Sequence, residues 1–223
     1  MMNILTSDIL MILSSILAIF AIIYTLAYNI ISNPVVEVFP ADDKITEGDI
    51  INRRKWYHLK ARVKSPPLPK LFRREPAIMC RVKVDFLDNE GFEKGEKIEK
   101  IRLTDQIEAH WTRQPEPVAF GRFQHSLIPM ACERTVGFSE EMFDILIKYQ
   151  DDEGFYAANP WIVYRFPKDH PEYQKLKVSA KECIVKVTIE AINLNKSYEY
   201  KFILKNKGPK MGDIEILPYK GKN

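Results

Sequence analysis

The chain has 223 residues, enough for one sizeable hydrophobic core, and its 46% hydrophobic content is too high for a disordered protein. Its 33 Lys and Arg against 30 Asp and Glu give a formal net charge of +3, far below the excess typical of a dedicated nucleic-acid binder. Three cysteines are too few for a disulfide framework, and no close pair of them suggests a zinc site. We therefore expect one folded domain, and nucleic acid is disfavoured as its partner.

Residues 9–31 carry no charged side chain, and their few polar members are mild enough to bury within a helix. At about 1.5 Å per residue the segment would span roughly 34 Å, against a hydrocarbon core of about 30 Å. Asn33 and Pro34 then end the helix. We expect a transmembrane helix over residues 9–32, which enters the lipid bilayer through residues 9–31 and follows a short tail of residues 1–8.

A cleaved signal peptide and a buried core helix are the two alternatives to a membrane anchor. Signal peptides begin with basic residues and have a shorter apolar run, whereas residues 1–8 contain no Lys or Arg. The basic residues follow the helix, beginning with Lys44, and the positive-inside bias then places the C-terminal part in the cytoplasm. We expect a single-pass protein of the cell membrane with a cytoplasmic C-terminal domain, and the extracellular orientation is the alternative.

Alternation of apolar and polar residues dominates the sequence beyond the helix. Apolar residues occupy alternate positions of residues 57–63 and 78–86, which is typical of half-buried strands. Further strands are expected at residues 35–39, 97–103, 143–149, 161–166, 182–190, 198–204 and 213–217, with a turn at residues 88–91 and an irregular connection over residues 104–129. For residues 143–149 a short helix is the alternative.

This pattern of short strands without amphipathic helices between them predicts an all-β fold. We expect an antiparallel immunoglobulin-like β-sandwich over residues 53–223, joined to the single N-terminal transmembrane α-helix by a linker of residues 33–52.

Four short motifs carry a resemblance to a known family. They are residues 56–63, 77–91, 111–117 and 202–206, and together they cover most of residues 56 to 206. In this order they resemble an uncharacterised family of archaeal and bacterial β-sandwich proteins of immunoglobulin-like type, with the transmembrane helix as an addition here. The resemblance implies the sandwich fold and transfers no catalytic residue.

The sequence shows no recognisable catalytic, cofactor-binding or metal motif. Its four histidines are scattered without a His-Glu-x-x-His pattern, and no glycine-rich phosphate loop is present. Residues 151–154 are acidic but lack the ligand spacing of a calcium loop, so we expect a solvated turn there. Cys80 and Cys183 flank Trp111 in the immunoglobulin order, but they are too far apart in sequence, and we expect two buried thiols.

Residues 53–74 are basic throughout, with nine Lys or Arg and no Asp or Glu. Anionic lipid headgroups attract such residues near a membrane. We expect contact with anionic lipid headgroups or an acidic protein, and an ordinary solvated face or nucleic-acid contact are the alternatives. The candidate contact residues are Arg53, Arg54, Lys55, Lys60, Arg62, Lys64, Arg73 and Arg74.

Together these features predict a membrane-anchored, non-enzymatic β-sandwich module for binding or scaffolding. An extracellular adhesive or envelope component is one alternative. An enzyme with an unrecognised site is the other, with Trp111, Glu116, His110 and Asp151 as its candidate residues.

Overall fold

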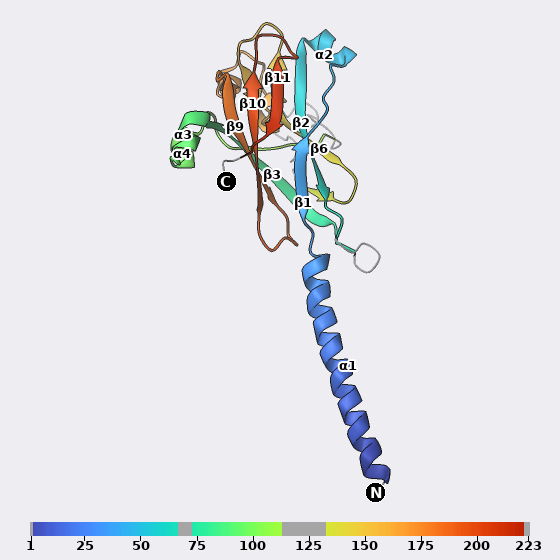
Figure 1. Cartoon of the computed structure of the whole chain (residues 1–223). Helices are drawn as coiled ribbons and strands as arrows, with labels where there is room; N and C mark the ends of the chain where they lie inside the picture. Colours follow the sequence, from blue (N-terminus) through green and yellow to red (C-terminus); the bar gives the residue numbers. More distant parts are fainter. Residues whose placement is uncertain (1, 67–72, 113–132, 221–223) are drawn as a thin grey trace.

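The computed structural model describes residues 2–66, 73–112 and 133–220, with side chains from Leu10 onward. Its first helix, α1 (Met2–Ser32), projects away from a β-rich domain (Figure 1). Within α1, Leu10–Ser32 has a mean hydropathy of 2.5 and is not covered by the rest of the chain. By length and composition this helix is able to cross a membrane, although a signal sequence has the same properties. It is not a core helix of the β-rich domain.

Two antiparallel sheets, with short helices between some of their strands, form the rest of the described chain. The first has the order β1-β2-β6-β7-β8, made of β1 (Val36–Pro40), β2 (Arg54–Val63), β6 (Glu141–Tyr149), β7 (Phe155–Ala157) and β8 (Lys177–Val178). The second has the order β11-β10-β9-β3-β4, made of β11 (Ile214–Pro218), β10 (Tyr198–Asn206), β9 (Glu182–Glu190), β3 (Ala77–Asp88) and β4 (Ile107–Glu108), and β5 (Arg134–Val136) also pairs with β3. The predicted antiparallel β-rich fold behind an apolar N-terminal helix is confirmed.

The two sheets share one hydrophobic core. Along β2 the side chains of Tyr57 and Val63 and the alternate residues between them are buried, as the alternation predicted. Trp111 is fully buried, and its Nε1 donates a hydrogen bond of 3.3 Å to the carbonyl oxygen of Cys80 on β3. Its ring meets that of Phe143 on β6 at 5.4 Å between centroids. Trp111 therefore links the two sheets.

The segment expected as a linker, residues 33–52, contains β1 and the short helix α2 (Glu47–Asn52). β1 pairs with β2 along its whole length, from Val36 opposite Val63 to Pro40 opposite Leu59. The side chain of Val36 is fully buried in the core. The first sheet therefore begins at Val36, soon after the end of α1, and not at Arg53.

Two of the expected strands are wrong, because both segments form short helices. Residues 97–103 hold α4 (Ile98–Ile101), which follows α3 (Asn89–Glu93) where a simple turn was expected. Asp88 begins α3, since its Oδ2 accepts a hydrogen bond of 2.8 Å from the amide of Gly91. β3 pairs with β9 from Arg81 to Asp88, and only the end of residues 97–103 returns to β3, through an isolated antiparallel bridge between Leu87 and Arg102.

The other wrong strand, residues 161–166, holds α5 (Pro160–Val163), which begins with a proline and is followed by α6 (Pro171–Gln174). The strand expected over residues 143–149 is confirmed as part of β6.

Candidate functional site

A cleft of about 530 Å³ lies on the outer face of the first sheet, where β2 and β6 meet the segment that leads into α2. Four carboxylates and two histidines are the main groups of its lining: Asp42, Asp43, Asp49, Asp144, His58 and His110. Nothing in their sequence spacing indicated that these residues meet, because they come from four separate segments of the chain.

Asp144 on β6 lies between the two histidines. Its Oδ1 is 3.5 Å from Nε2 of His58, and its Oδ2 is 3.2 Å from Nδ1 of His110. The side chains of Asp144 and His110 are only 7% and 4% exposed, so water screens their contact weakly. Nε2 of His110 is buried and has no hydrogen-bond partner among the described residues.

Asp43 holds the segment before α2 against β2. Its Oδ2 accepts a hydrogen bond of 2.8 Å from the amide of His58, and its carbonyl oxygen accepts one of 2.8 Å from Nζ of Lys55. Thr46 and Asp49 then form a capping box that begins α2. The register of β2 against β6 shifts between Tyr57 and His58, and such irregularities redirect side chains. These local features bring the carboxylates and His58 to one place.

An aromatic pair and two cations complete the cleft. The rings of Trp56 and Tyr164 stack at 6.0 Å between centroids, and the guanidinium of Arg54 lies 5.7 Å from the Trp56 ring centroid. Lys44 is the second cation of the lining. Four carboxylates against two permanent cations leave the cleft with an excess of negative charge.

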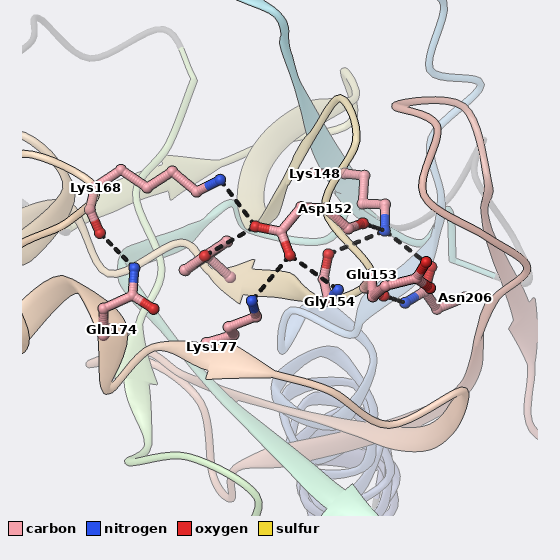
Figure 2. Close-up of polar contacts among 9 residues, drawn as sticks. Lys148, Asp152, Glu153, Gly154, Lys168, Gln174, Lys177 and Asn206 are labelled. Carbon is pink, nitrogen blue, oxygen red and sulfur yellow. Dashed lines mark hydrogen bonds and ion pairs between the residues drawn. The ribbon is translucent and has the colours of Figure 1, made fainter.

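A second polar cluster lies in the turn between β6 and β7 (Figure 2). Lys148 is fully buried, and its Nζ donates hydrogen bonds to the carbonyl oxygens of Asp152 (2.6 Å) and Gly154 (2.9 Å) and to Oδ1 of Asn206 (3.1 Å). Burial lowers the pKa of Lys148 despite the nearby carboxylates. All three protons of its ammonium group are used, so Lys148 is a structural residue.

Asp152 is the acidic centre of the same cluster, with a side chain 9% exposed. Its carboxylate contacts Lys168 at 2.8 Å and Lys177 at 3.0 Å, and it accepts a hydrogen bond of 3.0 Å from the hydroxyl of Tyr156. Burial alone would raise the pKa of Asp152, but these hydrogen bonds outweigh burial and hold the pKa well below its usual value. The expected turn is present, but it is solvated only in part: Asp151 and Glu153 are exposed, whereas Asp152 and Gly154 are buried.

The structure divides the basic residues of the sequence between the two ends of β2. Arg53, Arg54 and Lys55 lie at the end farther from α1, about 30 Å along the strand from Val63. Arg53 forms an ion pair with Asp151, and the buried Lys55 contacts Asp43. These three residues do not share a surface with the end of α1.

Lys60 and Arg62 point outward from β2, as predicted, but they are neutralised. Lys60 pairs with Glu140 at 2.9 Å, and Arg62 pairs with Glu37 at 2.6 Å. The sequence pattern could not reveal these pairs, because the acids come from other strands and loops.

Lys64, Arg73 and Arg74 lie beside the end of α1. The Lys64 amide donates a hydrogen bond of 2.8 Å to the carbonyl oxygen of Val35, and Nη1 of Arg74 donates one of 2.9 Å to the carbonyl oxygen of Lys64. Lys64 and Arg73 are exposed.

The candidate residues of the enzyme alternative do not come together. His110 lines the cleft, Trp111 is buried between the sheets, and Asp151 pairs with Arg53 at the surface. Glu116 lies outside the described residues.

Cys80 and Cys183 are free and buried, as predicted. Burial raises the pKa of Cys80 to about 11 and that of Cys183 to about 12, so neither has the thiolate character of a nucleophile. Both lie in the second sheet, where Cys183 faces Asp88 and not Cys80, so they cannot bridge the two sheets.

Within residues 2–66, 73–112 and 133–220, no group of three or more His, Cys, Asp or Glu is arranged to hold a metal ion. No family model matches the chain, and comparisons with the curated proteins and with the solved structures find no match either.

Proposed function

We propose that the chain is a single-pass membrane protein whose β-rich domain is a non-enzymatic binding module on the cytoplasmic side. The observation that supports the anchor is the apolar surface of Leu10–Ser32, which no other part of the described chain covers. Water solvates such a surface poorly, at a cost of roughly 25 cal/mol per Å², whereas hydrocarbon accommodates it.

Membrane extraction tests the anchor. The full chain is expressed in cells, the membrane fraction is washed with alkaline carbonate, and the mass of the retained chain is measured. Retention at full mass supports a membrane anchor. A soluble chain that lacks residues 1–32 would show that the helix is a cleaved signal sequence.

Protease treatment of intact cells tests the orientation. Lys and Arg are absent from residues 1–8 and begin after the helix, and this asymmetry supports a cytoplasmic domain. A C-terminal tag should be protected until the cells are lysed. Digestion of the tag in intact cells would favour the extracellular adhesive or envelope component.

The cleft around Asp144 is the proposed binding site, and its excess of carboxylates favours a cationic group of a partner. Asp43 and Asp144 would attract the cation. The cleft opens on the outer face of a sheet, and its β2 residues, from His58 to Arg54, lie roughly 17–30 Å along the strand from the end nearest α1, so the anchor leaves it accessible.

Titration of the full chain in detergent micelles with a trilysine peptide tests this site, with intrinsic tryptophan fluorescence as the signal, since Trp56 lines the cleft. Asp144→Asn keeps the shape of the side chain and should weaken binding at least about tenfold. Glu90→Gln is the matched control, because Glu90 lies on α3 with its side chain 85% exposed. An equal loss in both variants, or no saturable binding by the unsubstituted chain, would refute the site.

We also propose that the domain is an immunoglobulin-like sandwich of the archaeal and bacterial family that its motifs resemble. Two antiparallel sheets around one core, with a buried tryptophan between them, support this class. The placement of both buried thiols in one sheet departs from the inter-sheet disulfide of antibody domains. An experimental structure of a member of that family would test the assignment by its strand order.

One observation favours the enzyme alternative, namely the contact between His110 and Asp144, since such a carboxylate orients a general base. The described residues place no thiol in the cleft, and the hydroxyl of Thr112 donates a hydrogen bond of 3.1 Å to the carbonyl oxygen of Met142. Binding is therefore the better supported function. A hydrolytic activity that His110→Ala abolishes while peptide affinity persists would overturn it.

A further inference from the structure

We propose that the end of the domain nearest α1 docks on the bilayer surface, with apolar side chains inserted among the lipids and cations on anionic headgroups. This inference rests on the proposed membrane anchor. The docking face consists of the apolar residues Ile78, Met79, Phe138 and Ile192 and the cations Lys64, Arg73, Arg74 and Lys196.

Direct hydrogen bonds hold the docking face next to the end of α1. The amide of Glu75 donates a hydrogen bond of 2.8 Å to the carbonyl oxygen of Ser32, the last residue of the helix. Only Asn33, Pro34 and Val35 separate Ser32 from the first strand of the domain. If α1 spans the bilayer, this end of the domain lies at the headgroups.

The connection between β9 and β10 joins the same surface. Ile192 donates a backbone hydrogen bond of 3.1 Å to the carbonyl oxygen of Ile78, and the amide of Ile78 donates one of 2.8 Å to Oδ1 of Asn193. Asn193 in turn donates a hydrogen bond of 2.9 Å to the carbonyl oxygen of Pro76. Figure 1 shows this connection extending toward the end of α1.

Exposed apolar side chains gather at this end. Ile192 is 73% exposed, Phe138 is 50% exposed, and Ile78 and Met79 are each 42% exposed. Phe138 follows Gly137, whose carbonyl oxygen accepts a hydrogen bond of 2.6 Å from the amide of Val63. Two loops and the first residues of β3 therefore present large apolar groups beside one helix end, the pattern of a surface that meets another apolar phase.

The backbone at Ile78 and Met79 departs from a regular strand. The register of β3 against β5 shifts between Ala77 and Cys80, so that two consecutive apolar side chains are exposed. Met79 has a φ of 54°, a left-handed conformation that is costly for a residue with a side chain. This irregularity exposes both side chains to water, so they bury little apolar surface and add little to the stability of the isolated domain.

The charges of the docking face favour anionic lipid. Lys64, Arg73, Arg74 and Lys196 form no ion pair within the described residues. Most neighbouring acids are already paired, with Glu37 on Arg62, Glu133 on Arg81 and Glu190 on Lys83. Glu75 alone remains as an unpaired carboxylate among the residues of this end that the structure describes. Phosphatidylserine headgroups would neutralise the excess positive charge.

Depth-dependent fluorescence quenching in vesicles tests the proposal. The full chain is reconstituted into vesicles of phosphatidylcholine with about 30% phosphatidylserine, with an environment-sensitive fluorophore on Ile192→Cys. Ile51→Cys is the matched control, since Ile51 is also an isoleucine, is also 73% exposed and lies on α2 at the far end of the domain. Labelling of the unsubstituted chain measures the background from the native cysteines.

A quencher carried by the lipid at the glycerol level should quench the fluorophore at position 192 at least about threefold more than the fluorophore at position 51. Lys64→Glu combined with Arg73→Glu should reduce the quenching at position 192, and pure phosphatidylcholine should reduce it in the same direction. Equal quenching at the two positions would overturn the proposal.

Flotation of the same vesicles separates this failure from failure of the anchor. A chain that floats with the vesicles but shows equal quenching retains the anchor and lacks the docking. A chain that does not float refutes the proposed anchor, and the docking inference with it.

Discussion

Nζ of Lys148 on β6 donates a hydrogen bond of 3.1 Å to Oδ1 of Asn206 on β10, and so joins the first sheet to the second (Figure 2). The amide nitrogen of Asn206 donates a hydrogen bond of 2.6 Å to the carbonyl oxygen of Glu153 in the turn after β6. A buried ammonium group needs every one of these partners, because an unsatisfied charge inside a protein is costly.

Asn206→Ala should therefore lower the free energy of unfolding by about 2 kcal/mol, because it leaves one proton of the Lys148 ammonium without a partner. Urea unfolding of the full chain in detergent micelles, followed by tryptophan fluorescence, measures this change. Asn195→Ala is the control, since Asn195 is exposed. Equal stability of the two variants would show that the link between the sheets contributes little.

Asp152 should make the domain sensitive to acid. The pKa of Asp152 is held below its unfolded value of about 3.9, so the unfolded chain binds more protons between the two pKa values. The stabilisation is thus complete above about pH 4 and is lost as the pH falls below it. As the pH is lowered from about 5 to about 2, the melting temperature of Asp152→Asn should fall less than that of the unsubstituted chain. An unchanged slope would mean that other carboxylates dominate acid unfolding.

Gly91→Ala should destabilise the domain. A Cβ atom at position 91 would lie 2.4 Å from Cγ2 of Ile101, so α3 and α4 would have to separate. We expect a loss of about 1–3 kcal/mol, partly offset by the higher helix propensity of alanine. Gly137→Ala is the matched control, because its Cβ would meet no atom within 4 Å. Thermal unfolding compares the two, and a stable Gly91→Ala would contradict the packing of α3 on α4.

The native thiols of Cys80 and Cys183 should not react with iodoacetamide at pH 8. Burial raises their pKa values to about 11 and about 12, so almost no thiolate is present at that pH. The chain with Cys132→Ser isolates these two groups, since Cys132 lies outside the described residues. Mass spectrometry should find no alkylation of the folded chain and two alkylated cysteines after denaturation. Rapid alkylation of the folded chain would show that a thiol is accessible.

The sequence alone determined the features that depend on local pattern. The uncharged run of residues 9–31 identified the apolar helix, because its length and hydropathy need no other part of the chain. Strict alternation in residues 57–63 identified β2 and its buried face, since side chains of a strand point to opposite sides at every step. Residues 97–103 and 161–166 show the limit of this reasoning, because short apolar runs without strict alternation are also compatible with a single helical turn.

Only the tertiary structure decided which charged groups meet. Lys148 stands between Ile147 and Tyr149 in the sequence, a position typical of the polar face of a strand, yet the turn after β6 and Asn206 on β10 enclose it. Asp144 and His110 are separated by 34 positions and come within 3.2 Å only through the strand pairing. The basic residues of the sequence are likewise divided between the two ends of β2, and the cations between them, Lys60 and Arg62, form ion pairs with Glu140 and Glu37. Periodicity fixes which face of an element is buried, whereas ion pairs and clefts depend on the register between elements distant in sequence.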